Sequence, residues 1–151
     1  MISHSHDELG AHVSVQGGAD RAPERAAALD AAVLQMFTKM PNRWADPVIG
    51  EKRADAFREA RAEYGIRTVA AHDSYLINLA SPDRTLWERS ATSFASELAR
   101  CEAYGVDLLV THPGNATDRD FERGIEANAF GLTQAMRAEP GRTEVLLEIT
   151  A

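Results

Sequence analysis

Apolar and polar positions follow two different periods along the chain. Short apolar runs rich in β-branched residues, such as 66–72 (IRTVAAH) and 106–112 (VDLLVTH), predict buried strands. Between such runs, apolar side chains recur at helical spacing, as at Ala54, Phe57 and Ala60. The pattern predicts strands over 9–13, 31–38, 66–72, 106–112 and 143–149, and helices over about 19–30, 51–64, 84–104 and 118–138.

The strict alternation of strand and helix predicts a parallel sheet with right-handed crossovers. Two architectures fit this order. One is an open, doubly wound sheet, which five strands could complete. The other is a (β/α)8 barrel, which needs about 250 residues, whereas this chain has 151. Alternation alone therefore favours the open sheet. We expect a single domain over residues 9–151, after a flexible N-terminus of residues 1–8.

Composition and charge narrow the class of protein. Hydrophobic residues make up 44% and charged residues 26%, a globular balance, and no apolar run reaches the length of a membrane span. The polar start MISHSHDELG lacks an apolar signal core, so we expect a cytoplasmic protein with no membrane partner. Cys101 is the single cysteine and fits the core face of a helix. The net charge of −7 disfavours basic-patch binding of nucleic acid, unless bound metal ions invert the local charge.

Histidines stand at the predicted strand ends. His12, His72 and His112 end or follow three of the predicted strands, and Glu148 lies near the end of the last. The carboxyl ends of parallel strands meet at one edge, where active sites form. Two imidazoles and a carboxylate with an open position suit catalytic zinc, and also manganese or iron. We interpret His72, His112 and Glu148 as a metal site; for any one histidine alone, a hydrogen-bonded strand end is the alternative.

Other polar residues receive weaker interpretations. His12 and Asp73 are predicted neighbours that support the ligands, although His12 also fits a ligand. His4 and His6 are interpreted as solvated residues of the N-terminus. The chain contains no G-x-G-x-x-G, Walker or G-x-S-x-G motif, which disfavours a nucleotide-binding fold and a serine hydrolase.

Several blocks, in order, resemble the endonuclease IV family. They are GAHVSVQGG (10–18), MFTK followed by Trp44, HDSYLINL (72–79) and THPGN (111–115), and LLEITA (146–151) resembles the family's strand-five block. The resemblance implies a parallel (β/α)8 TIM barrel, here incomplete with about five strands and four helices, in place of the open sheet. It also implies the N-terminal part of an enzyme of base-excision repair that cleaves double-stranded DNA 5′ to abasic sites with up to three zinc-type ions. Manganese is a possible substitute.

The resemblance also assigns roles to residues. It implies that His72, His112 and Glu148 are metal ligands, and that Glu148 bridges to a second ion and orients or deprotonates the attacking water. Tyr75 and Leu76 match a loop that enters the minor groove at the lesion. Further contacts with DNA are expected from Ser14, Gly17, Gly18 and Lys39.

Three positions depart from the family pattern. Met40 and Asn42 stand where the family has a polar residue and an arginine, and Ile149 replaces an asparagine. The family's remaining ligands come from strands six to eight. We therefore expect this chain to be a shortened one, which supplies all the protein ligands of one ion only. We expect it to be inactive alone. The complete enzyme is expected to be a monomer, and the shortened chain could self-associate. Two alternatives stay open: a sugar isomerase or epimerase-like barrel with a closed pocket, and a non-catalytic half-barrel that binds metal or dimerises.

Overall fold

Five strands and four helices alternate through residues 9–149, which this computed structural model describes. The strands are β1 (Gly10–His12), β2 (Val33–Phe37), β3 (Thr68–His72), β4 (Leu108–Thr111) and β5 (Glu144–Leu147). The helices are α1 (Arg21–Ala27), α2 (Glu51–Glu63), α3 (Arg84–Tyr104) and α4 (Phe121–Ala138). The expected flexible N-terminus, with His4 and His6, lies outside the described residues.

The strands pair in their order along the chain. The sheet runs β1-β2-β3-β4-β5, and each neighbouring pair is parallel. A doubly wound sheet would reverse its strand order at a switch point, whereas a barrel advances in one direction. The incomplete TIM-barrel arrangement is therefore confirmed, and the open doubly wound sheet is excluded.

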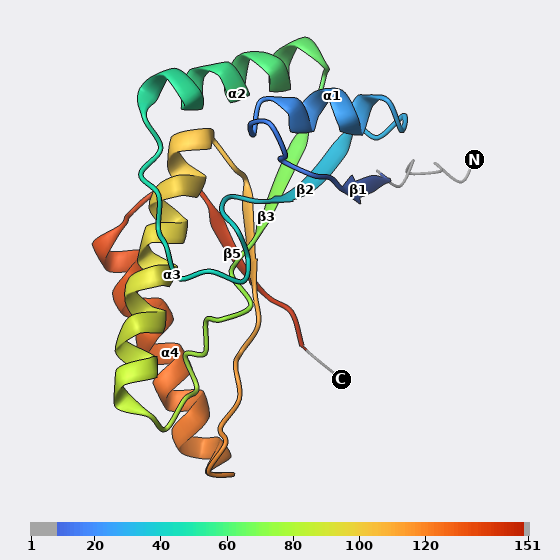
Figure 1. Cartoon of the computed structure of the whole chain (residues 1–151). Helices are drawn as coiled ribbons and strands as arrows, with labels where there is room; N and C mark the ends of the chain where they lie inside the picture. The colour runs from blue at the N-terminus through green and yellow to red at the C-terminus, as the bar shows by residue number, and fades with distance from the viewer. Residues whose placement is uncertain (1–8, 150–151) are drawn as a thin grey trace, which may run out of the picture.

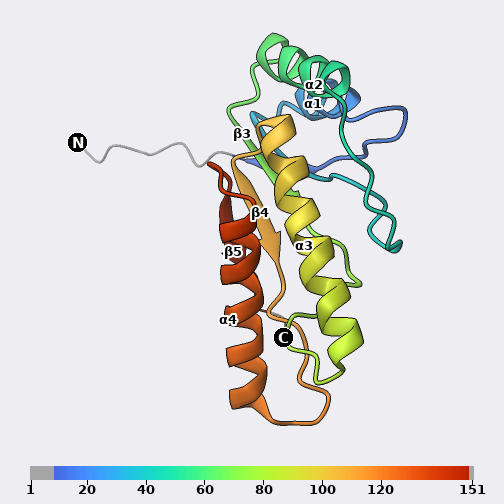
Figure 2. The ribbon, with the colours of Figure 1, turned by 90° about the vertical axis from the view of Figure 1, so that its left-hand side faces the viewer.

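The helices gather on one side of the sheet. Helices α3 and α4 run side by side beyond the strands, and the opposite side of the strands carries no described helix (Figures 1 and 2). Among residues 9–149, none of the helices is long and apolar enough to cross a bilayer.

Side chains alternate between the two faces of each strand. In β2, Leu34 and Met36 are buried against the helices and pack in the same core as Phe57 and Phe94. The intervening positions, such as Gln35, face a hollow of about 440 Å³ on the bare side. That hollow corresponds to the inside of the barrel wall. Cys101 is fully buried, as its helical position predicted.

Capping residues set the helix ends. The Asp83 carboxylate accepts a hydrogen bond from the Leu86 amide at 2.9 Å, and α3 ends at Gly105, whose φ of 71° suits glycine. The helix predicted from residue 118 begins only at Phe121. The difference arises because the Asp120 carboxylate caps the helix by accepting from the Arg123 amide at 3.1 Å.

The outer surface of α4 remains apolar and uncovered. Phe121, Ile125 and Leu147 are exposed and border a groove of about 360 Å³ that Leu132 also lines. In a complete barrel, this is the side on which the helix after β5 would pack.

Candidate metal centre

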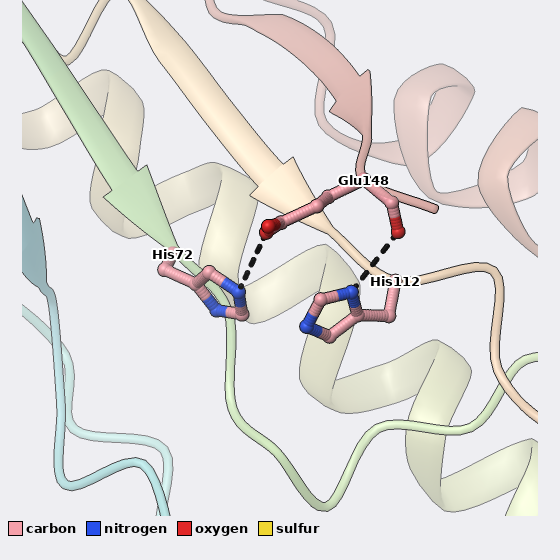
Figure 3. A group of neighbouring side chains, drawn as sticks. All are labelled: His72, His112 and Glu148. Atoms are coloured by element: carbon pink, nitrogen blue, oxygen red, sulfur yellow. Dashed lines mark hydrogen bonds and ion pairs between the residues drawn. The ribbon is translucent and has the colours of Figure 1, made fainter. Parts of the chain in front are cut away.

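Three strand ends bring three candidate ligands together. His72 is the last residue of β3, His112 follows β4 directly, and Glu148 follows β5 directly. Because β3, β4 and β5 are hydrogen-bonded neighbours, these ends lie side by side. One ligand atom from each residue lies within 4.8 Å of the others, and Figure 3 shows the three side chains facing a common point.

The distances fit a single ion. His72 Nε2 lies 3.6 Å from Glu148 Oε2, and the two imidazole rings are 5.0 Å apart between centroids. Metal bonds of about 2.0–2.1 Å in a tetrahedron place neighbouring ligand atoms about 3.4 Å apart. The separation between His72 and Glu148 is close to this value. All three ligand atoms lie within 4.8 Å of one another, so the group must draw closer together to bind a zinc-type ion.

Backbone carbonyls fix both imidazoles in the tautomer that binds metal. His72 Nδ1 lies 2.9 Å from the Asp73 carbonyl oxygen. His112 Nδ1 lies 3.0 Å from the Glu148 carbonyl oxygen, the contact marked by a dashed line in Figure 3. A carbonyl oxygen only accepts, so Nδ1 carries the proton in each ring. The lone pair of each Nε2 is then free for a metal ion, and this outer hydrogen bond is typical of metal-binding histidines.

Asp73 lies beneath the ligands. Its Oδ1 is 3.6 Å from His72 Nδ1, and Thr111 Oγ1 donates to its Oδ2. Burial raises the pKa of Asp73 to about 7, although the Thr111 hydrogen bond acts in the opposite direction. Sequence reasoning did not single out Thr111, which β4 directs toward the helix side of the sheet.

His12 stands beside the three ligands, outside their group. Its ring packs on Phe37 at 4.6 Å between centroids, and Phe37 in turn contacts the His72 ring at 5.7 Å. The Gln35 side-chain amide nitrogen lies 3.0 Å from His12 Nδ1. Burial, and then the nearby His72, lower the pKa of His12.

The loop after β3 presents Tyr75 at the surface. The tyrosine is 63% exposed, and its ring lies against Phe37 at 5.4 Å and against His72 at 5.6 Å. Leu76 beside it is half-buried. The tyrosine therefore projects from the rim immediately above the candidate metal ligands.

The loop after β1 is open and glycine-rich. Gly17 has a φ of 89° and Gly18 a φ of 138°, conformations that other residues rarely adopt. Arg25 donates to the carbonyl oxygens of Ser14 and Gln16, which ties the loop to α1. This loop follows β1, and β2 separates it from the ligands on β3.

Lys39, expected to contact DNA, is buried in the structure. Its side chain is 3% exposed, and its ammonium group donates to Asp46 at 2.8 Å and to Ser93 at 3.0 Å. Its ammonium group is therefore buried and paired within the protein, and a contact with DNA stays a prediction. Lys39 belongs to a cluster of charges that the sequence pattern did not reveal.

The comparisons with known proteins define the class first. Residues 23–151 match the family described as the xylose isomerase-like TIM barrel, and the chain belongs to this family. Its sequence relatives include proteins named probable endonuclease 4: it is 44% identical over 140 residues to that of Halorhodospira halophila, covering 93% of this chain and 47% of the relative. It is 39% identical to that of Trichlorobacter lovleyi, covering 96% and 52%.

Solved structures agree with this assignment. Endonuclease IV from Thermus thermophilus is similar with a TM-score of 0.78 and 30% identity, over 93% of this chain and 51% of that chain. A D-tagatose 3-epimerase-like protein matches at a TM-score of 0.67 but at 14% identity, which shows the fold alone. The resemblance to the N-terminal part of endonuclease IV is therefore confirmed. The chain spans about half the length of the curated relatives it matches.

Proposed function

We propose that this chain forms the first half of a metal-dependent DNA-repair endonuclease that cleaves double-stranded DNA 5′ to abasic sites. The observation that carries the proposal is the convergence of His72, His112 and Glu148, with both Nδ1 atoms held by backbone carbonyls. The names of its relatives, probable endonuclease 4, support an endonuclease activity. Since the chain spans about half of those relatives, the proposal concerns the complete enzyme.

We expect zinc in the group, with manganese as the alternative ion. The holding atoms are Nε2 of His72, Nε2 of His112 and a carboxylate oxygen of Glu148. When bound, such an ion lowers the pKa of a water molecule and polarises a phosphoryl oxygen. In the complete enzyme we expect up to three ions.

Glu148 is the proposed general base. Its side chain is 56% exposed, so its carboxylate can reach a water molecule and a substrate phosphate. The carboxylate takes a proton from that water while the water oxygen attacks phosphorus. The phosphorus–oxygen bond to the 3′ oxygen of the nucleotide on the 5′ side of the lesion breaks, and this leaving oxygen takes up a proton from solvent water to become a hydroxyl. The hydrogen bond from His112 to the Glu148 carbonyl keeps the glutamate backbone in place during this step.

The rim loops are the proposed contacts with DNA. Tyr75, exposed above His72 and Phe37, is placed to enter the minor groove together with Leu76. The backbone amides of the loop from Ser14 to Gly18 can approach phosphate closely, because Gly17 and Gly18 carry no side chain. Bound ions offset the net charge of −7 at the place where phosphate binds.

A small-sugar substrate is the less favoured alternative. The epimerase-like structures share only the fold with this chain. An exposed Tyr75 suits a large substrate that docks on the rim, whereas a sugar enzyme needs side chains that close a pocket. We therefore favour DNA.

The full-length protein should be assayed on a duplex with a single abasic site, with an undamaged duplex of the same sequence as the control. We expect incision on the 5′ side of the lesion, loss of incision after chelation, and recovery with zinc. An absence of chelator-sensitive incision would contradict the proposed function. Turnover of a ketose with no cleavage of DNA would favour the sugar enzyme instead.

A further inference from the structure

A cluster of buried charges lies under the loop that follows β2. We call it the Asp46 clamp; it consists of Lys39, Asp46, Ser93, Glu97 and Arg100. Arg100 and Glu97 are both fully buried on α3 and pair at 2.6 Å. Lys39 lies just after β2, which ends at Phe37, so the clamp joins the segment after that strand to α3.

Asp46 is the member of the clamp that belongs to the loop. Its Oδ1 accepts from Lys39 Nζ at 2.8 Å and from Ser93 Oγ at 3.2 Å. The same oxygen lies 3.2 Å from Arg100 Nη1, a buried nitrogen that forms no hydrogen bond within the described chain. The two buried cations therefore need this carboxylate as well as Glu97 to balance their charge.

The clamped loop is also bonded to the loop that carries Tyr75. The Pro41 carbonyl oxygen accepts from Ser74 Oγ at 2.7 Å and from the Tyr75 amide at 3.1 Å. Met40, next to Pro41, is 58% exposed, so its apolar side chain is open to a binding partner. Met40 and Tyr75 thus stand on two loops whose backbones are joined at one carbonyl.

We propose that Asp46 is a positioning residue, which holds the 40–49 loop on the buried clamp so that Met40 and Tyr75 are presented together to the DNA lesion. An abasic site leaves a gap in the base stack, and apolar side chains that enter the minor groove can occupy such a gap. Asp46 itself contacts no substrate in this account. The inference rests on the proposed function.

The test compares two carboxylates in the full-length enzyme. Asp46→Asn keeps the shape but removes the charge, and Asp55→Asn does the same to an exposed aspartate that pairs with Arg58 on α2. We expect Asp46→Asn to raise KM for the abasic duplex about tenfold with kcat within about twofold, because a mobile loop weakens binding of ground state and transition state alike. Asp55→Asn should match the wild type, and both variants should retain their zinc.

A double-mutant cycle shows whether Asp46 acts through the rim. If it positions Tyr75, Asp46→Asn should raise KM much less in the Tyr75→Ala background than in the wild type. The inference would be overturned if Asp46→Asn raised KM by the same factor in the Tyr75→Ala background as in the wild type. A KM no higher than that of Asp55→Asn, or a loss of zinc in step with the loss of activity, would also overturn it.

A milder variant covers the case in which Asp46→Asn does not fold. Ser93→Ala removes the hydrogen bond to Asp46 and the one that Ser93 accepts from Lys39, and it leaves every charge of the clamp in place. It should raise KM in the same direction, by a smaller factor, and an unchanged KM would count against the inference. These outcomes are separable from the proposed function, which fails only when the wild type shows no chelator-sensitive incision.

Discussion

The metal-ligand group and the Asp46 clamp lie at the same end of the sheet and are built differently. Each ligand stands at or just beyond a strand end, and strand register with backbone carbonyls sets the geometry. The clamp joins the segment after a strand, a loop and a helix, and its buried Lys39, Glu97 and Arg100 are compensated with the help of the partly exposed Asp46. The side chains of the first region are available to bind a metal ion, so a substitution there should change catalytic activity more than the free energy of unfolding. A substitution in the clamp should instead lower the free energy of unfolding and change the position of the 40–49 loop.

The largest expected effect is the loss of the proposed base. Glu148→Gln keeps the shape of the side chain but cannot take up a proton, so the incision rate should fall by about 10²- to 10⁴-fold. The thermal midpoint should stay close to that of the wild type, because the side chain is largely exposed. Glu144→Gln, at the other end of β5, is the matched control and should incise normally. Equal rates for the two variants would remove Glu148 from the chemistry.

The clamp should show the opposite behaviour. Arg100→Met leaves Glu97 buried without its countercharge, which should lower the free energy of unfolding by about 3–5 kcal/mol in urea titrations. Arg84→Met, at an exposed pair with Glu88 on the same helix, should leave the urea midpoint unchanged. A clamp variant as stable as the Arg84 variant would show that the buried charges are not coupled.

A smaller effect is expected where α3 holds the start of β5. The Glu102 carboxylate accepts from the amides of Arg142 and Thr143, each at 2.7 Å. Burial alone would raise the pKa of Glu102, but these hydrogen bonds outweigh it and lower the pKa below the ordinary 4.5. Glu102→Gln should therefore cost about 0.5–1 kcal/mol at neutral pH, after allowance for solvent screening.

The pH dependence of that cost follows from the sign of the shift. A depressed folded-state pKa gives stability that is present above the unfolded value of 4.5 and is lost as the pH falls through the folded value. Urea titrations from pH 7 to pH 3 should show the wild type and Glu102→Gln converging at the acid end. A constant difference across that range would rule out an ionised acceptor.

The metal-ligand group was predictable because its geometry follows from local pattern. An apolar run that ends in His72 or His112 places the residue at a strand end, and parallel pairing then brings neighbouring ends together. Alternation alone favoured an open sheet, however, because five strands can complete an open sheet but not an eight-stranded barrel. The family blocks were needed to favour the barrel, which the unidirectional strand order then confirmed.

The clamp was not predicted because it depends on tertiary contacts across the sequence. Lys39 and Arg100 are 61 positions apart, and their shared partner Asp46 lies on a loop with no periodicity. One local signal was present: Glu97 falls in phase with the buried Phe94 and Cys101 on α3, a place where a charge requires a partner. Reading that signal would have marked α3 as the site of a buried ion pair.

The most direct test of the central claim is the zinc content of purified protein in three versions. His72→Ala removes a proposed ligand, and His12→Ala removes a neighbouring histidine that lies outside the ligand group. We predict that the wild type and His12→Ala carry the same amount of zinc per chain, and that His72→Ala carries about one ion fewer. Equal zinc in all three proteins would contradict a metal centre built on His72, His112 and Glu148.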